Sequence, residues 1–143
     1  MLDAGYLAPS GNNSREFILV TDRDKLDPLS NTTPFMPWLK QAQAGIVVTG
    51  RPDVSKYWLQ DASIACAFMW LEAVDLGLGG GCGAGYDGRG GEESTHRESF
   101  VRDGLSIPTD RQVVAILGFG YPKEIPETKK LLRREDIVRY DTF

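Results

Sequence analysis

The sequence predicts a mixed α and β fold, because segments with strand-like and helix-like patterns alternate along the chain. Three short runs rich in β-branched residues are bounded by turn residues, and a long apolar segment with helix-capping signals lies between two of them. The chain has 143 residues, of which 41% are hydrophobic and 25% charged. This length suffices for one hydrophobic core but is short for two, so we expect residues 1–143 to form a single domain.

The first half of the chain predicts one short helix and two strands. Residues 1–7 resemble the end of a helix that Pro9 stops, because a proline ring disfavours helical geometry at the preceding residue. After the polar loop "PSGNNS", residues 17–21 form the first predicted strand, and the run "AGIVVTG" at 44–50 forms the second. The segment between the two strands carries two prolines near a tryptophan, which predicts a loop with a short helix.

From Lys56 the pattern predicts a helix of about 20 residues, with Asp53 or Ser55 as its N-cap and Gly77 just beyond its C-terminus. Its middle, "ASIACAFMWLEAV", is apolar nearly all round, which in a soluble protein indicates burial on several sides. We infer that a second subunit covers part of this helix, most often through two-fold symmetry. The alternative is a core helix wrapped by the strands of one monomer.

Glycines are concentrated in the segment "GLGGGCGAGYDGRGG" at 77–91, which holds nine of the 16 in the chain. Gly83, Gly85 and Gly88 match the G-x-G-x-x-G pattern of dinucleotide-binding sites. That pattern is informative only where it joins a strand directly to a helix, and here further residues separate it from the next helix. We instead expect the backbone of 79–85 to approach a flat ligand, since glycine has no Cβ to intrude. The later glycines are equally consistent with a flexible loop.

The last third of the chain predicts an amphipathic surface helix at 92–104 and a third strand in "QVVAILGFGYP" at 112–122. The tail that follows is charged, but it also carries apolar side chains that are able to anchor it on another surface. These are Leu131, Leu132, Ile137, Val138, Tyr140 and Phe143.

Charge and composition exclude several classes of function. A formal net charge of -4 and a pI of about 5.0 provide no basic field for nucleic acid. The longest apolar run is far below the roughly 20 residues that span a bilayer, and the N-terminus shows no basic-then-apolar leader. We therefore expect a cytoplasmic protein that does not contact membranes. Cys66 and Cys82 match neither a disulfide framework nor a zinc site, so reduced thiols are expected.

The sequence shows no set of side chains for nucleophilic, acid–base or metal-dependent catalysis. His96 is the only histidine and falls on the predicted surface helix. Asp61, near the start of the long helix, is expected to orient or cap local structure rather than to move protons. We therefore predict no catalytic side chain.

Four segments resemble, in this order, the FMN-dependent nitroreductase family: "LAPSGNNSREFILVTD", "YWLQDASIACAFMWLEAVDLGLGGGCGAGYD", "IPTDRQVVAILGFGYP" and "VRYDTF". The resemblance covers most of the chain. It implies an α+β fold with three layers, α-β-α, in which a mostly antiparallel sheet is flanked by helices and a long central helix is buried in a homodimer. It also implies two FMN sites at the dimer interface.

The resemblance assigns FMN contacts to a P-S-x-x-N loop and to the glycine-rich segment. The loop residues are Pro9, Ser10, Asn12 and Asn13, and the backbone residues are Cys82, Gly83, Ala84 and Gly85. In relatives the loop reaches the flavin of the other subunit, although the same residues also make a good turn. An amide N–H of Ala84 or Gly85 pointing at the flavin N5 would orient the atom that accepts hydride.

Charged residues complete the site that the resemblance implies. Lys129 aligns with a lysine that binds the FMN phosphate, but Leu131 replaces an arginine of the family. The missing charge would then come from Lys130, Arg133 or Arg134, unless this run is a solvated face. Arg15 aligns with a glutamine or arginine beside the isoalloxazine, where it would stabilise the reduced flavin. A surface salt bridge is the alternative for Arg15.

The implied activity is hydride transfer from NADH or NADPH through flavin N5 to a small electron acceptor such as a nitroaromatic compound or a quinone. Family members normally begin further upstream, with an Arg-Ser-x-Arg segment that grips FMN, and this sequence starts inside what would be the second helix. The sequence is therefore either truncated or a natural short form with weakened FMN binding. A binding or scaffold protein of the same fold that has lost its flavin is the competing hypothesis.

Overall fold

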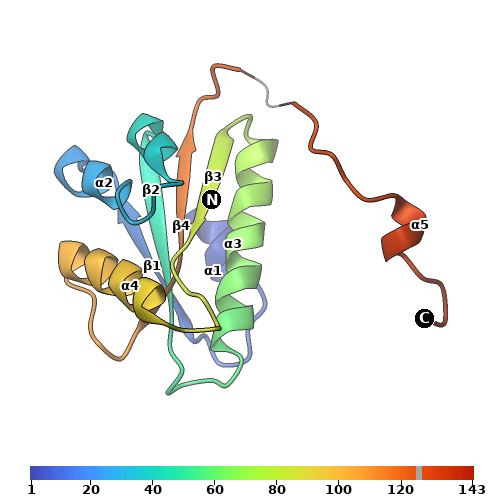
Figure 1. The fold of residues 1–143 in the computed structure, drawn as a ribbon, viewed down its shortest axis with the longest axis horizontal. Helices are drawn as coiled ribbons and strands as arrows, with labels where there is room; N and C mark the ends of the chain where they lie inside the picture. The colour runs from blue at the N-terminus through green and yellow to red at the C-terminus, as the bar shows by residue number, and fades with distance from the viewer. Residues whose placement is uncertain (125–126) are drawn as a thin grey trace.

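The computed structural model describes residues 1–124 and 127–143 and has a four-stranded antiparallel sheet between two layers of helices (Figure 1). The strands are β1 (Arg15–Val20), β2 (Ala44–Gly50), β3 (Gly79–Ala84) and β4 (Gln112–Gly120). Their spatial order is β1-β2-β4-β3, and every neighbouring pair is antiparallel. The expected α+β class with a mostly antiparallel sheet is thus confirmed.

Helices cover both faces of the sheet. One layer contains α1 (Leu2–Leu7) and α3 (Trp58–Asp75). The other contains α2 (Arg23–Leu29), the 3₁₀ helix η1 (Pro37–Gln41) and α4 (Glu92–Leu105). The three-layer arrangement that the resemblance implies is confirmed. A further short helix, α5 (Arg134–Ile137), lies in the tail, away from the sheet (Figure 1).

Two hydrophobic clusters fill the spaces between the layers. Because successive strand residues point to opposite faces, the neighbours Ile116 and Leu117 of β4 enter different clusters, and both are fully buried. Ile116 packs on the side of α2 and α4, where Leu26 lies, and Leu117 packs on the side of α3, where Met69 lies. The two central strands are therefore covered on both faces, which explains their continuous apolar sequences.

A β-bulge interrupts the pairing of the central strands. Val48 of β2 lies opposite Ala115, whereas the next residue, Thr49, lies opposite Val113, so Val114 is the extra residue of β4. The Val114 carbonyl accepts the N–H groups of the two residues that follow β3, at 2.9 Å from Gly85 and 3.3 Å from Tyr86. The bulge thereby fixes where the chain leaves the glycine-rich strand.

The predicted strands β1, β2 and β4 are found, but β3 and α2 are elements that the sequence analysis did not predict. Strand β3 lies in the glycine-rich segment, where the β-branched residues that mark strands are missing. Its glycines make room for side chains of the chain itself. A Cβ at Gly81 would lie 2.6 Å from the Trp38 ring, and one at Gly83 would overlap the sulfur of Met36. Packing within the chain thus accounts for these two glycines.

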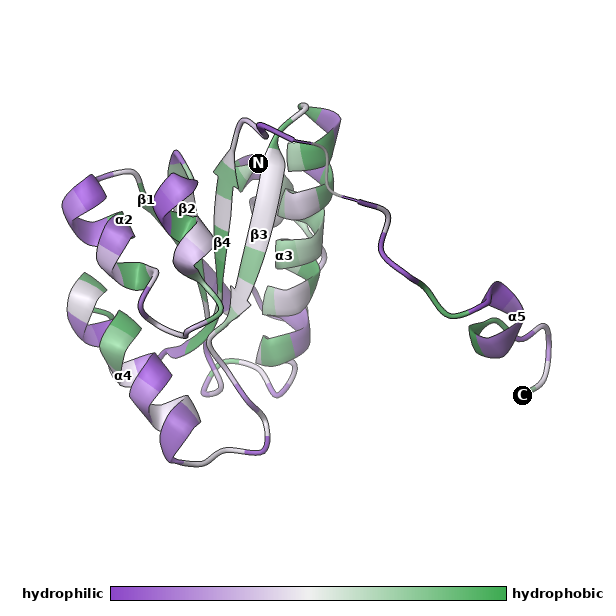
Figure 2. Ribbon diagram, turned by 45° about the horizontal axis from the view of Figure 1, so that its top comes forward, coloured by the Kyte–Doolittle hydropathy of each residue, from purple (hydrophilic) through white to green (hydrophobic). Residues whose placement is uncertain are grey.

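Helix α3 confirms the predicted long helix and its C-terminal end, where Gly77 has a φ of 73°. Its N-cap is Tyr57 rather than Asp53 or Ser55. The Ser55 hydroxyl accepts the Tyr57 N–H at 3.0 Å, which belongs to the residue before the first helical residue, Trp58, and so it does not cap the helix. The face that packs on the sheet is buried, whereas Leu71 on the opposite face is 68% exposed. The strands of this chain therefore do not wrap the helix. Figure 2 shows hydrophobic segments along α3 in green.

The tail after residue 126 does not pack on the sheet or its helices (Figure 1). Its apolar side chains Leu131, Leu132, Ile137, Tyr140 and Phe143 are exposed. The surface that they were expected to anchor on is not supplied by the described part of this chain. None of the helices among the described residues combines the length and the apolar character needed to cross a membrane.

Candidate functional site

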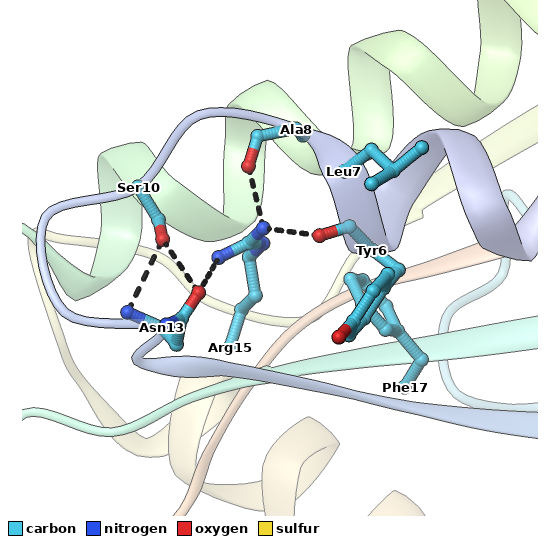
Figure 3. A pocket seen from close by; sticks show the side chains of 7 residues that line it. All are labelled: Tyr6, Leu7, Ala8, Ser10, Asn13, Arg15 and Phe17. Carbon is cyan, nitrogen blue, oxygen red and sulfur yellow. Dashed lines mark hydrogen bonds between the residues drawn. The ribbon is translucent and has the colours of Figure 1, made fainter.

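Three predicted site residues, Ser10, Asn13 and Arg15, line one cavity of about 570 Å³ between α1, the following loop and β1 (Figure 3). This volume is typical of small-molecule sites. Tyr6, Leu7, Ala8 and Phe17 complete the lining. The predicted residues Pro9 and Asn12 lie in the same loop but are not part of the lining.

The P-S-x-x-N loop forms a tight turn that its own side chains stabilise. The Ser10 hydroxyl accepts the Asn13 N–H at 3.1 Å and donates to the Asn13 Oδ1 at 3.2 Å. Asn13 has a φ of 52°, a left-handed conformation that asparagine tolerates better than most residues. The turn that the sequence suggested is therefore present, and it presents two polar side chains to the cavity.

Arg15 is buried, with 8% of its surface exposed, and its guanidinium binds carbonyl groups at the end of α1. Its Nη2 donates to the carbonyls of Ala8 at 2.5 Å and Tyr6 at 2.9 Å, and its Nε donates to that of Gly5 at 3.4 Å. Its Nη1 donates to the Asn13 Oδ1 at 3.4 Å (Figure 3). The surface salt bridge considered for Arg15 is therefore wrong, since carbonyls and an amide take the place of a carboxylate.

The positive charge of Arg15 has no carboxylate partner among residues 1–124 and 127–143. A guanidinium carries five N–H donors, and these hydrogen bonds use four of them. One N–H of Nη1 thus has no hydrogen-bond partner among the described residues. A buried cation with a free donor, beside two polar side chains, matches a ligand with an anionic or electron-rich group.

Asp61, in the first turn of α3, holds the same loop from the other side. Its carboxylate is buried, with 4% of the residue exposed. Oδ1 accepts the Gly11 N–H at 3.1 Å, and Oδ2 accepts the Ser14 hydroxyl at 2.8 Å. The prediction that Asp61 orients local structure is confirmed.

At the end of β3, only one of the two amides considered for flavin N5 is free. The Gly85 N–H donates to the Val114 carbonyl, which removes Gly85 from that role. Amides of an antiparallel strand alternate between its two edges, so the N–H of Ala84, opposite Ala115, points away from β4. Within the described residues β3 is an edge strand, and the Ala84 amide therefore faces the uncovered edge.

Both predicted segments meet the N-terminal turn of α3. Trp58 contacts Tyr86 edge to face, with ring centroids 5.0 Å apart and planes at 85°. This contact ties the end of β3 to the turn whose Asp61 holds the P-S-x-x-N loop. Gly50 allows the arrangement, because a Cβ there would lie 2.5 Å from the Trp58 ring. The start of α3 thus joins the two halves of the candidate site.

The two cysteines are free thiols, as predicted. Burial raises the pKa of Cys66 to about 12, and the proximity of Cys82 contributes in the same direction. Partial burial also raises the pKa of Cys82. Both thiols are therefore protonated near neutral pH, which does not favour a role for Cys82 as a nucleophile.

The predicted phosphate ligands do not reach this region. Lys129 and Lys130 are exposed in the tail, where they line a local cavity of about 480 Å³ with residues of the same segment. Arg133 pairs with Asp136 at 2.8 Å. Within the described part of this chain, these basic residues are exposed and lie away from the cavity, and their role toward a phosphate stays a prediction.

His96 is exposed on α4, as predicted. The described residues contain no group of histidine, cysteine, aspartate and glutamate side chains that is suited to hold a metal ion. The sequence analysis did not identify Phe17 as a lining residue, although the period of two along β1 puts it on the same face as Arg15.

Comparisons with known proteins agree on one family. The family model described as "Nitroreductase family" matches residues 23–121. A protein of Archaeoglobus fulgidus with the provisional name NADH dehydrogenase/NAD(P)H nitroreductase is 35% identical over 130 residues, which cover 87% of this chain and 71% of that protein. A solved structure from Bacteroides thetaiotaomicron with the same provisional name has a TM-score of 0.85 and 31% identity, covering 99% of this chain and 82% of the other. An FMN-dependent nitroreductase from Clostridium difficile has a TM-score of 0.81 and 30% identity, covering 99% and 84%.

Proposed function

Because this chain belongs to the nitroreductase family, a family of oxidoreductases, we propose that it binds FMN and oxidises NADH or NADPH. The chemistry supplied by FMN is two-electron transfer, from the nicotinamide to the flavin N5 and then to a nitroaromatic compound, a quinone or a similar acceptor. The relative from Clostridium difficile is described as FMN-dependent, and the one from Archaeoglobus fulgidus carries NAD(P)H in its name.

The observation that carries this proposal is the buried, unpaired charge of Arg15 beside the polar turn. Its free Nη1 donor, with Ser10 and Asn13 on the same cavity wall, fits an anionic or electron-rich part of FMN. Such a part is either the phosphate or the pyrimidine edge of the flavin ring. Because the carbonyls at the end of α1 hold the guanidinium in place, Arg15 would bind the group without losing further side-chain entropy.

The free edge of β3 supports the second half of the proposal. The Ala84 amide is a backbone donor in a fixed orientation at an edge that a flat ring is able to approach. The protonated thiols and the exposed His96 supply no proton relay to this edge. The residues of this chain would accordingly bind and orient the reactants, with no side chain required to move a proton.

We further propose that a second copy of the chain completes the site. The outer face of α3 exposes Phe68, Leu71 and Val74 at adjacent turns, and the tail exposes a second set of apolar side chains. Exposed apolar side chains that are neighbours on one helix face are characteristic of protein interfaces. Light scattering coupled to size-exclusion chromatography would give a mass near twice 15.8 kDa. A monomer at all concentrations would contradict the homodimer.

The experiment that tests the function is a titration of the 143-residue chain with FMN, followed by flavin fluorescence. We expect saturable binding near micromolar or tighter, and bleaching of the flavin absorbance when NADH or NADPH is added without oxygen. A nitroaromatic compound or a quinone should then restore the absorbance. No binding up to about 1 mM, which corresponds to about -4 kcal/mol, would overturn the proposal and favour the flavin-free alternative.

A further inference from the structure

We infer that Asp61 is a positioning residue for the cofactor: it fixes residues 10–14 in the conformation that presents Ser10, Asn13 and Arg15 to the cavity. This inference rests on the proposed function, because it concerns how the loop is prepared for FMN. Asp61 itself does not line the cavity, so it acts through the loop and not by contact with a ligand.

The two oxygens of Asp61 grip the loop at two points. Oδ1 accepts the backbone N–H of Gly11 at 3.1 Å, and Oδ2 accepts the hydroxyl of Ser14 at 2.8 Å. Asn13 lies between these two points, and Ser10 lies immediately before the first. The positions of both cavity-lining polar side chains are therefore determined by a residue some 50 positions away in the sequence.

The grip extends to Arg15. Ser14 is fully buried and directly precedes Arg15, and its carbonyl accepts the Arg51 N–H at 2.7 Å. Asp61 holds the side chain of Ser14, and Arg51, the residue directly after β2, holds its carbonyl. Ser14 therefore cannot shift without moving the start of β1. Arg15 is thus fixed at two places. Carbonyls at the end of α1 bind its guanidinium, and Asp61 holds its backbone through the neighbouring Ser14.

The dependence between Asp61 and the loop is mutual. Among the described residues the Asp61 carboxylate takes part in no ion pair, so the Gly11 N–H and the Ser14 hydroxyl are the groups that compensate its burial. Its place in the first turn of the 18-residue helix α3 also favours a negative charge. A displaced loop would leave a buried carboxylate without donors, which is strongly unfavourable. The loop is therefore held in one conformation before any ligand binds.

The test compares the FMN dissociation constants of three loop-contact variants and one control variant with that of the unmodified chain. Asp61→Ala removes both hydrogen bonds, and we expect FMN binding to weaken about tenfold or more. Asp61→Asn keeps an oxygen for the Gly11 N–H and offers its NH₂ to the Ser14 oxygen, so binding should stay within about threefold. Ser14→Ala removes one hydrogen bond, so its FMN affinity should lie between those of Asp61→Ala and Asp61→Asn. This variant replaces Asp61→Ala in the test if Asp61→Ala does not fold. Val101→Ala, in the opposite hydrophobic cluster, is the control for lost stability alone.

A second measurement is independent of FMN: amide hydrogen exchange at Gly11, whose N–H donates to Asp61. Exchange should accelerate at least tenfold in Asp61→Ala, stay near the unmodified rate in Asp61→Asn, and leave the β2 amides unchanged. Unchanged exchange and unchanged FMN affinity in Asp61→Ala would overturn the inference, as would an equal loss of affinity in Val101→Ala. If the unmodified chain does not bind FMN, the proposed function fails, while Gly11 exchange still decides whether Asp61 fixes the loop.

Discussion

Replacing Gly81 by alanine should destabilise the protein because of one aromatic ring. Gly81 of β3 lies opposite Gly118 of β4, and the Trp38 ring covers this pair of glycines. A Cβ at Gly81 would lie 2.6, 2.7 and 2.8 Å from three ring carbons, about 0.8 Å short of ordinary contact at 3.4 Å. The same ring lies equally close to the partner glycine, since a Cβ at Gly118 would lie 2.7 Å from it. We expect a loss of about 1–3 kcal/mol, the usual cost of overpacking.

The assay is urea unfolding of a double-mutant cycle with Trp38→Leu. If the overlap with the ring is the cause, Gly81→Ala should cost little in the Trp38→Leu background, and the coupling energy should approach the full 1–3 kcal/mol. An equal cost in both backgrounds would refute this explanation. An unchanged stability together with weaker FMN binding would instead indicate that the glycine is needed for a flat ligand, as the sequence had suggested.

Substitutions at three other positions should give results of different sign and kind. Gly104→Ala, in α4 with nothing within 4 Å of the added Cβ, should stabilise the protein by up to about 1 kcal/mol, measured in the same urea assay; a loss would contradict the open surroundings. Arg15→Met should weaken FMN binding about tenfold and lower the melting temperature, because the carbonyls at the end of α1 lose their donor; Arg15→Lys should restore part of both. Cys66 makes stability depend on pH: its thiol is neutral in both states below its ordinary pKa of 9.0, and between 9.0 and about 12 it ionises only when the chain unfolds. Stability should therefore fall across that window more steeply in the unmodified chain than in Cys66→Ala, and equal slopes would show that the thiol is not shielded.

The predictable parts of the fold are those in which the signal is local. The strands β2 and β4 are continuous apolar runs, and α3 ends at a glycine with positive φ, so each carries its own pattern. Strand β3 has no such local pattern. Its glycines Gly81 and Gly83 are required by the side chains of Trp38 and Met36, which lie more than forty residues earlier in the chain. No short-range pattern records such a contact, and the segment was therefore interpreted as backbone that approaches a flat ligand rather than as a strand.

The candidate site was predictable to a similar degree. The resemblance indicated Ser10, Asn13 and Arg15, which the structure brings to one cavity. It did not indicate that Arg15 is held by carbonyls of α1, nor that Asp61 holds the loop, because these are backbone and long-range contacts that residue types do not encode. Lys129 and Lys130 were placed by alignment alone, and the described chain gives them no contact with the cavity.

The order of the strands has a consequence for how the chain is made. The two central strands, β2 and β4, are separated by residues 51–111. Strand β2 therefore cannot pair with β4 until α3, β3 and α4 have been synthesised. At 5–20 residues per second, roughly 3 to 12 seconds pass before β4 emerges. During this interval the apolar run of β2 has one unpaired edge, and β1 is its sole strand partner. The nascent chain thus exposes for some seconds an apolar strand edge that β4 covers in the folded protein, and this edge is a site for aggregation during synthesis.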